Sequence, residues 1–400
     1  MQEGKMTTTA AQDKALLVAP KLPEAPASQA FVEVARKFGV SPIAQFREMI
    51  RLRLSPRKID LHEYFTFGLY NPDLSAEDKQ AYVGQVSTFR TNAKMSPPEL
   101  TVNLAFVRDK VMYSALLNTL GIRSTVTQAV ASPKRKFGAI PALATPEDVH
   151  RFLTKEAVYP VFGKPCQGSG SFGSALLSGI EDDMIVLGNG QRVSLDRFCR
   201  EVFDDYPDGF MFQTALRQHE TLKAISGNAV GSLRFVTIRD GDAPRRLYAL
   251  WKVPSPNAMS DNFWQEGSIL VQIDENGVLG EARMGTGTRS CAVDKHPVSG
   301  MVFKGVQIPH WDALQQTCID AHSLYPEFGV VGWDIAVTED GPTIIESNVN
   351  PYHSLYQLAY GRGFLNAEFA PAVEKAAAIS GDMLKSRDAL EENRRKARKS

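Results

Sequence analysis

Residues 332–348, with the sequence GWDIAVTEDGPTIIESN, carry the most information about the fold. Two runs rich in β-branched residues flank Glu339-Asp340-Gly341, which predicts a β-hairpin with a three-residue loop whose glycine takes the left-handed position. Counting back from that loop places Asp334 directly opposite Glu346. Asn348 follows two residues later on the same face, because side chains alternate along a strand.

These side chains bring oxygen ligands to one face of otherwise apolar strands. Two carboxylates opposed in a ladder are destabilising unless a cation neutralises them. Ligation by oxygen alone suits Mg²⁺, which takes one or two carboxylates together with nucleotide phosphates. The hairpin therefore predicts a metal site, and the alternative is a hairpin with solvated acidic residues on its wet face.

The composition is that of an ordinary globular protein. The 400 residues suffice for two or three domains, and charged and hydrophobic residues make up 22% and 43%. Lys plus Arg equals Asp plus Glu, at 45 each, so local clusters must carry any anion binding. The cysteines form no CxxC pair, and apolar runs fall short of the roughly 20 residues that span a bilayer. We expect a cytoplasmic protein with no membrane span and no nucleic-acid partner.

Periodicity divides the chain into parts. Residues 1–30 predict a disordered leader, and residues 31–105 a helical region. Short strands and helices then alternate without strict βαβ order, which predicts an α+β fold. Residues 366–400 predict a C-terminal helix with a basic tail, interpreted as solvated rather than as an arm for nucleic acid or membrane. Strands are expected near 158–164, 209–213, 232–238, 246–253, 268–273 and 328–337, and helices near 109–120, 194–203 and 311–323.

A small basic stretch lies within the N-terminal helical region. It consists of Arg51, Arg53, Arg57 and Lys58. We interpret it as a solvated face, with contact to phosphate as the alternative.

A glycine-rich loop, Gly168-Ser169-Gly170-Ser171-Phe172-Gly173, matches the GxGxxG pattern. A dinucleotide-binding fold needs a helix directly after such a loop, whereas residues 174–187 read as further strand. Strand, loop and strand form a flap whose backbone N–H groups fold over phosphates; a flexible hairpin tip is the alternative. Lys164 precedes the loop, and the chain has no HRD, DFG or GxxxxGK[ST] sequence, which argues against protein kinases and P-loop NTPases.

Several further segments occur along the chain in the same order, relative to these motifs, as in a known family. They are Asp109-Lys110, Phe162-Gly163-Lys164-Pro165, Phe212-Gln213-Thr214-Ala215-Leu216, Arg217-Gln218-His219-Glu220, Ser232-Leu233-Arg234-Phe235-Val236-Thr237, Asp261-Asn262-Phe263, His296-Pro297-Val298-Ser299-Gly300, Ile308-Pro309-His310-Trp311 and the Asp…Glu-x-Asn hairpin. Over roughly residues 100–365 the chain resembles the ATP-grasp superfamily, and more narrowly its sugar-transfer associated group, which is related to α-L-glutamate ligases.

The resemblance implies two α+β subdomains, residues 106–215 and 216–365, that close on ATP. The residues it implies at phosphate are Lys110, Lys164, Gly168, Ser169, Gly170 and Ser171, and those at adenine are Gln213, Ala215 and Leu216. Asp334, Glu346 and Asn348 would hold Mg²⁺. Such a site provides the positioning and charge neutralisation that phosphoryl transfer needs.

The implied activity is a Mg·ATP-dependent carboxylate–amine ligase that forms an acyl phosphate on a small amino acid, peptide or sugar-linked carboxylate. ATP and Mg²⁺ are the expected cofactors and a small carboxylate and an amine the expected partners, with a homo-oligomer left open. Two alternatives stand beside it. One is an ATP-grasp phosphotransferase acting on a hydroxyl, and the other a non-catalytic nucleotide-binding partner of a glycosyl-transfer assembly.

Arg234 is the candidate for holding the substrate carboxylate and its tetrahedral intermediate, because a guanidinium fork binds oxyanions bidentately. A strand salt bridge is its alternative role. Lys252 is a candidate further phosphate contact. The substrate candidates are His219, Asn228, Asp261, Asn262 and His296. The histidines at 219, 296, 310 and 353 could line the substrate site or shuttle protons, and structural hydrogen bonding is the alternative for each of them. Residues 349–353 depart from the family pattern, which leaves the acceptor pocket open.

Overall fold

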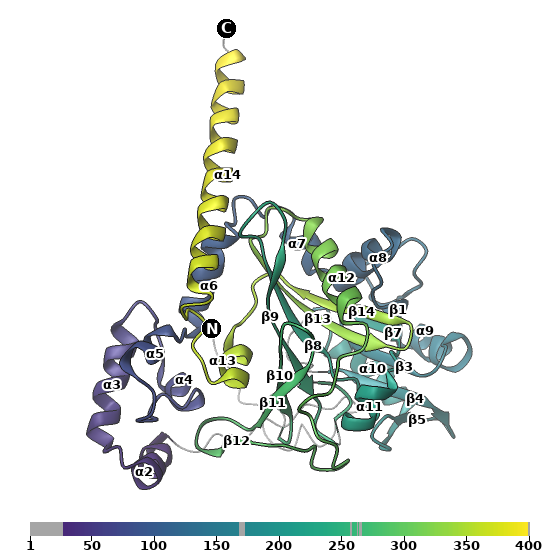
Figure 1. The fold of residues 1–400 in the computed structure, drawn as a ribbon. Helices are drawn as coiled ribbons and strands as arrows, with labels where there is room; N and C mark the ends of the chain where they lie inside the picture. Colours follow the sequence, from purple (N-terminus) through teal and green to yellow (C-terminus); the bar gives the residue numbers. More distant parts are fainter. Residues whose placement is uncertain (1–26, 168–172, 257, 262, 264–265, 399–400) are drawn as a thin grey trace.

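The computed structural model describes residues 27–167, 173–256, 258–261, 263 and 266–398 (Figure 1). Within these residues, a group of helices precedes two mostly antiparallel sheets of seven strands each, and a long helix follows them. This arrangement confirms the predicted α+β class and the N-terminal helical region. None of the helices in the described ranges is long and apolar enough to cross a membrane.

The N-terminal helices pack against the second sheet and against one another. They are α2 (Ala27–Phe38), α3 (Pro42–Leu54), α4 (Leu61–Thr66), α5 (Ala76–Ala81), α6 (Gln85–Met95), α7 (Leu104–Arg108) and α8 (Lys110–Thr119). Several begin at N-cap residues whose side chains accept a hydrogen bond from the first turn: Ser41 caps α3, Ser75 caps α5 and Asp109 caps α8. The cap at Asp109 makes Lys110 the first residue of its helix, as predicted.

The first sheet has the strand order β2-β1-β7-β3-β4-β5-β6. Its strands are β1 (Thr127–Ala131), β2 (Ala142–Leu143), β3 (Val161–Pro165), β4 (Ala175–Glu181), β5 (Met184–Leu187), β6 (Arg192–Ser194) and β7 (Phe210–Thr214). One face packs on α9 (Pro146–Arg151), the π-helical turn η1 (Phe152–Glu156) and α10 (Leu195–Asp204).

Side chains alternate along these strands, so residues of the hydrophobic core lie on one face of the first sheet and candidate site residues lie on the other. Val161 of β3 and Phe212 of β7 are buried under α9 and α10. Lys164 and Gln213 stand an odd number of residues away on the same strands, so they point to the opposite face. The face opposite α9 and α10 thus receives these polar side chains, and α8 covers another part of that face through Val111.

The second sheet has the order β12-β11-β10-β9-β8-β13-β14. Its strands are β8 (Leu233–Ile238), β9 (Arg245–Val253), β10 (Ile269–Ile273), β11 (Leu279–Met284), β12 (Cys291–Ala292), β13 (Val330–Thr338) and β14 (Gly341–Asn348). The helices after the first sheet are α11 (Glu220–Ser226), the 3₁₀ turn η2 (Gly287–Arg289), α12 (Trp311–Ser323), α13 (Ser354–Tyr360) and α14 (Ala370–Ala397).

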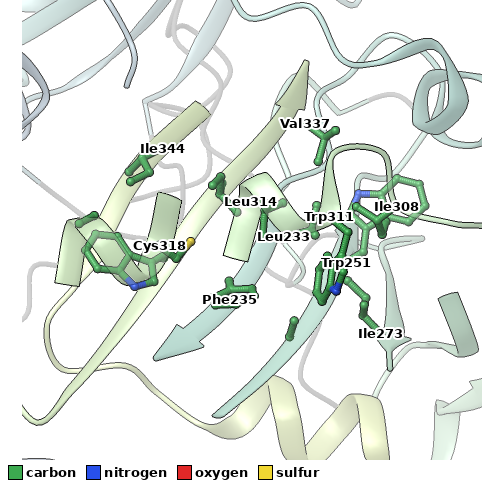
Figure 2. Packing of buried hydrophobic residues seen from close by; sticks show 14 of the residues in the cluster. Leu233, Phe235, Trp251, Ile273, Ile308, Trp311, Leu314, Cys318, Val337 and Ile344 are labelled. Carbon is green, nitrogen blue, oxygen red and sulfur yellow. The ribbon is translucent and has the colours of Figure 1, made fainter. Parts of the chain in front are cut away.

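The main core lies between this sheet and α12 (Figure 2). Leu233, Phe235 and Trp251 project from β8 and β9 toward Trp311 and Leu314 of α12. The reverse face is also apolar along part of its length, where the N-terminal helices, α13 and the start of α14 cover it. Beyond that cover, the reverse face carries charged residues, and these line the site described below.

The hairpin formed by β13 and β14 has the predicted pairing of its acidic residues, but its loop length and its register differ from the prediction. Asp334 lies opposite Glu346, as predicted. The predicted three-residue loop is wrong, because Thr338 pairs with Gly341 and the loop has two residues. The register then shifts by one residue between Ile335 and Asp334, so Ile345 is the extra residue of a β-bulge. The shorter loop and the bulge compensate each other, and Gly341 has a positive φ of 114°.

The other expected elements are present with small changes in their ends. The strand expected at 158–164 begins at Val161, and the helix expected at 311–323 is α12 with the same bounds. Strand β11 and helices α11 and α13 were not predicted. The C-terminal helix α14 extends beyond the body of the molecule (Figure 1), with its buried residues confined to its first half. The glycine loop at 168–172 lies outside the described residues.

We expect truncation of Trp251 to lower the stability of the protein strongly. Its ring is fully buried and its Nε1 donates to the carbonyl of Gly231 at 3.0 Å. Trp251→Ala leaves a cavity and an unpaired carbonyl, so the free energy of unfolding should fall by about 3–5 kcal/mol in urea titrations. Leu390→Ala on the exposed part of α14 is the control and should change it by about 0.5 kcal/mol or less. A similar small change for both variants would contradict this account of the core.

Candidate functional site

A cavity of about 610 Å³ is lined by residues of both sheets. The first sheet contributes the open face of β3 and β7, and the second contributes the charged end of β8, β9 and the β13–β14 hairpin. Residues 228–230, before β8, and the start of α8 complete much of its wall. Twelve of the candidate site residues within the described ranges line this cavity: Lys110, Lys164, Gln213, Ala215, Leu216, Asn228, Arg234, Lys252, Asp261, Asp334, Glu346 and Asn348.

Other candidates lie elsewhere or outside the described ranges. Gly168, Ser169, Gly170, Ser171 and Asn262 belong to the residues whose structure is not described. His219 and His296 do not line the cavity. We therefore leave these two histidines out of the substrate site.

The histidines have structural contacts where they stand. His219 accepts from the Thr221 N–H at 3.2 Å, at the start of α11, and its Nε2 lies 3.5 Å from Glu339. The ring of His310 packs at 5.6 Å from that of His219, centroid to centroid. His296 is buried, and its Nδ1 lies 3.3 Å from both the Ser299 N–H and its hydroxyl.

His353 is fully buried between Tyr248 and Asn92. Its Nδ1 lies 2.9 Å from the Tyr248 hydroxyl and its Nε2 lies 3.1 Å from the Asn92 side-chain oxygen. Burial, with a further contribution from Arg234, lowers the pKa of His353 to about 3. The ring is therefore neutral near pH 7, and its role is structural rather than that of a proton shuttle.

Asp334 is held by two cations on neighbouring strands. Arg234 is directly opposite it in the β8–β13 pair and donates from Nε to Oδ1 at 2.7 Å and from Nη2 to Oδ2 at 3.2 Å. The Nζ of Lys252 lies 3.3 Å from Oδ2. Burial alone would raise the pKa of Asp334, but Arg234 and Lys252 outweigh it and hold the pKa well below its usual range. The carboxylate is ionised at any physiological pH.

The charge network continues from Lys252 to Asp261. The Lys252 Nζ lies 3.0 Å from Asp261 Oδ2, and that oxygen also accepts from the N–H and hydroxyl of Ser232. Burial disfavours the charge of Lys252, yet Asp261 and Asp334 raise its pKa. Arg234 on β8, Asp334 on β13, Lys252 on β9 and Asp261 in the loop after β9 thus form a chain of alternating charge.

Glu346 and Lys110 form a second, looser pair. The Lys110 Nζ lies 3.4 Å from Glu346 Oε1, and the Glu346 side chain is 32% exposed. Asp109 positions this lysine by capping α8 and is itself paired with Arg135. Lys110 therefore reaches the cavity from the N-terminus of a helix, a location that favours anions.

Lys164 is buried at the cavity wall. Burial lowers its pKa to about 8, with Lys110 acting in the same direction and Glu346 opposing it. An ammonium group that is deprived of water in this way gains strongly from an anionic ligand.

Asn348 lies two residues beyond Glu346 and opposite Gly332. Its Nδ2 is buried without a hydrogen-bond partner among the described residues. This donor suits an acceptor such as a phosphate oxygen, whereas the Oδ1 of the same side chain is the atom that a cation with oxygen ligands would take. Within the described residues, no group of three or more His, Cys, Asp and Glu side chains is arranged to hold a metal ion, so a metal here would depend on this amide and on ligand oxygens.

The wall expected at adenine is only partly available for hydrogen bonding. Gln213 donates from its amide to the Thr125 hydroxyl at 2.7 Å. The backbone N–H of Ala215 donates to the Pro160 carbonyl at 3.1 Å. Leu216 follows at the cavity wall, where Leu176 and other apolar side chains also lie. Apolar walls of this kind suit the faces of a heterocyclic ring.

Sequence reasoning missed a wall that comes from the N-terminal helices. Phe89 of α6 lines the cavity together with Asn350 and Tyr352, which follow β14. Asn92 of the same helix donates to Asn350 Oδ1 at 2.7 Å and to the Pro351 carbonyl at 2.8 Å. The only signal in the sequence was the unusual segment 349–353; no local motif links it to α6, because the link exists only in the folded chain.

Residues 96–374 match the model of the sugar-transfer associated ATP-grasp family, which is more than half of the chain. The chain belongs to this family. The two α+β subdomains are those of the ATP-grasp fold, preceded here by helices α2 to α6, all of which end before the matched region begins. No curated protein matches the sequence.

Solved structures of ATP-grasp enzymes are distantly similar. The D-alanine–D-alanine ligase from Coxiella burnetii is 15% identical with a TM-score of 0.43, over 73% of this chain and 62% of that one. The L-amino acid ligase from Bacillus licheniformis is 13% identical (TM-score 0.37; 68% of this chain and 48% of that one), and the biotin carboxylase from Campylobacter jejuni is 13% identical (TM-score 0.41; 68% and 47%). This chain thus spans less than two thirds of each of these proteins, and similarity this distant says nothing about its substrates.

The two acidic residues of the hairpin should differ in their effect on stability. Asp334→Asn leaves Arg234 and Lys252 short of a counter-charge, so the free energy of unfolding should fall by about 3–5 kcal/mol. Glu346→Gln removes a partly exposed charge and should cost about 1 kcal/mol or less. Urea titrations of both variants at neutral pH measure the difference, and equal losses would contradict the network described here.

Nucleotide affinity should depend on pH through Lys164. Below about pH 8 this lysine is charged in the free protein. Above that pH, binding of a phosphate requires the lysine to take up a proton, which costs free energy. The affinity for ADP should therefore fall by up to tenfold per pH unit above about pH 8. Calorimetry at about pH 8 in buffers of different ionisation enthalpy should detect uptake of about half a proton on binding. Lys164→Met should bind more weakly and lose this uptake. An ADP affinity that is unchanged between about pH 7 and pH 9 in the wild type would contradict the assignment.

Proposed function

We propose that the chain is a Mg·ATP-dependent ligase that activates a small carboxylate as an acyl phosphate and joins it to an amine. The observation that carries the proposal is a single cavity in which phosphate-binding cations and oxygen ligands meet. Lys110, Lys164, Arg234 and Lys252 line it together with Asp334, Glu346 and Asn348. This combination suits a polyphosphate and its metal better than either a neutral ligand or a simple anion.

In this proposal, Lys110 and Lys164 bind the nucleotide phosphates from α8 and β3. Asp334, Glu346 and Asn348 would hold Mg²⁺, which supplies neutralisation of the charge on the phosphates. Leu216 and its apolar neighbours take the adenine ring. Glu346 is best suited to exchange its partner, because its pair with Lys110 is long and partly exposed.

Arg234 is the proposed carboxylate-binding residue. Its fork already binds one carboxylate in bidentate fashion, that of Asp334. With Asp334 bound to a cation, the N–H groups of Arg234 and Lys252 would be available to the substrate carboxylate and to the phosphoryl group in transfer. The network therefore links the arrival of the nucleotide to the formation of the substrate site.

The chemistry follows from this placement. A carboxylate oxygen of the substrate attacks the γ-phosphorus and ADP leaves, which gives an acyl phosphate. The amine nitrogen then attacks the carbonyl carbon, phosphate leaves, and the nitrogen loses a proton as the amide forms. Asn228, Asp261 and the wall made by Phe89 and Tyr352 border the remainder of the cavity and are the candidates for recognising the acceptor. An amino acid, short peptide or sugar-linked carboxylate is the proposed substrate class.

Trapping with hydroxylamine tests the proposal. The protein is incubated with Mg·ATP, hydroxylamine and a panel of amino acids, short peptides and uronic acids, and hydroxamate, ADP and phosphate are measured together. One acid should give all three products in equal amounts. Glu346→Gln should lower the rate at least about 100-fold, whereas Glu339→Gln, at the tip of the same hairpin and outside the cavity, should not change it.

Each other outcome selects an alternative. ADP formation that depends on an alcohol and yields no hydroxamate would indicate a phosphotransferase acting on a hydroxyl. Nucleotide binding without turnover on any member of the panel would favour a binding partner of a glycosyl-transfer assembly. Equal rates for wild type and Glu346→Gln would remove this residue from the metal site.

A further inference from the structure

Helix α3 exposes an apolar stripe on the outside of the N-terminal helices. Ile43, Phe46, Ile50 and Leu54 recur every three or four residues, so they share one face of the helix. Their exposed fractions are 68%, 56%, 44% and 74%. The buried residues of the helix, Gln45 and Leu52, stand on another side. Isolated exposed apolar residues are common, but a continuous stripe of four marks an interaction surface.

The stripe borders an apolar groove of about 710 Å³. The groove runs between α3 and the start of α4, and it receives Met49, Ile59, Leu61 and Phe65 in addition to residues of the stripe. Arg53 stands on its wall. We call the stripe and this groove together the α3 face.

Arginines flank the stripe on both sides. On a helix of 3.6 residues per turn, Arg47 and Arg51 lie to one side of the stripe and Arg53 lies to the other. Within the described residues, no carboxylate is within ion-pair distance of any of these guanidinium groups. The nearby carboxylates have other partners: Glu48 pairs with Lys79 at 2.8 Å, and Asp60 caps α4.

The apolar stripe and its flanking arginines together indicate what kind of partner binds the α3 face. An apolar stripe with basic residues along its edges is the pattern of a helix that lies in the surface of a membrane, where guanidinium groups bind lipid phosphates. A second copy of the chain is disfavoured, because a two-fold contact through this stripe would bring together arginines that have no carboxylate partner in the part of the chain that the structure describes.

We infer that the α3 face binds the surface of an anionic lipid bilayer. The apolar stripe enters the boundary between headgroups and acyl chains, and Arg47, Arg51 and Arg53 contact lipid phosphates beside it. In Figure 1, α3 lies at the outer edge of the molecule, away from β4 and β5 of the first sheet, so a bilayer in contact with α3 leaves that sheet clear. This inference does not depend on the ligase proposal.

Flotation of the full chain with vesicles tests the inference. Vesicles of phosphatidylcholine are compared with vesicles that also contain phosphatidylglycerol. The wild type should float with the anionic vesicles only, and added salt should reduce the bound fraction. Phe46→Glu/Leu54→Glu should abolish flotation, and Arg47→Gln/Arg51→Gln/Arg53→Gln should lower the partition coefficient by about fivefold for each arginine removed. Leu390→Glu, on the exposed part of α14, is the matched control and should float like the wild type.

Three results would overturn the inference. The first is a wild type that remains unbound with anionic vesicles. The second is flotation of both α3 variants to the same extent as the wild type. The third is a wild-type dimer in light scattering that Phe46→Glu/Leu54→Glu converts to a monomer while no vesicle binding is detected, which would make the α3 face a contact between copies.

Discussion

The bidentate pair between Arg234 and Asp334 is the constraint on which the site depends. It joins β8 to β13 at the charged end of the second sheet, with side chains only 12% and 13% exposed. Charges in such a place are tolerated only when they are paired, and Lys252 and Asp261 extend the pairing to β9 and beyond. The apolar remainder of the same face, covered by the N-terminal helices, fixes the strands that hold these charges in position.

The balance of charge in the cavity explains what the site requires. Among the described lining residues, the cationic side chains are Lys110, Lys164, Arg234 and Lys252, and the carboxylates are Asp261, Asp334 and Glu346. The cations therefore outnumber the anions by one. Burial lowers the pKa of Lys164, and Lys110 acts in the same direction while Glu346 opposes it. In the proposed function, a polyphosphate would more than offset the single excess cation, so a metal ion would then be needed to balance the charge. Binding of nucleotide and metal should thus favour each other, since each satisfies the charges that the other leaves unpaired.

Local sequence patterns predicted the parts of the site that lie on single elements. Asp334, Glu346 and Asn348 are close in the chain, and strand periodicity alone brings them to one face. Even there, the predicted loop was one residue too long, and the correct pairing resulted from a bulge at Ile345 that periodicity does not reveal. The salt-bridge role of Arg234, weighed only as an alternative, is the contact that the structure contains.

The parts contributed by distant segments could not be predicted in this way. Phe89 reaches the cavity, and Asn92 supports residues 350 and 351, only because α6 packs beside the end of β14. The histidines were weighed between a functional and a structural role, and burial or local capping accounts for the contacts that they make in the folded chain. Residue type and spacing thus indicate which chemistry is available, and packing decides which residues take part in it.

The central claim is that Asp334 exchanges its cationic partners for a metal ion when a nucleotide binds. Crystals grown with Mn²⁺ and a non-hydrolysable ATP analogue test it directly, because anomalous scattering locates the metal without reference to activity. The account predicts a manganese peak within coordination distance of Asp334, Glu346 and Asn348, with Arg234 no longer bidentate on Asp334. A nucleotide bound in the cavity with its metal away from these residues and the Arg234–Asp334 pair intact would contradict it.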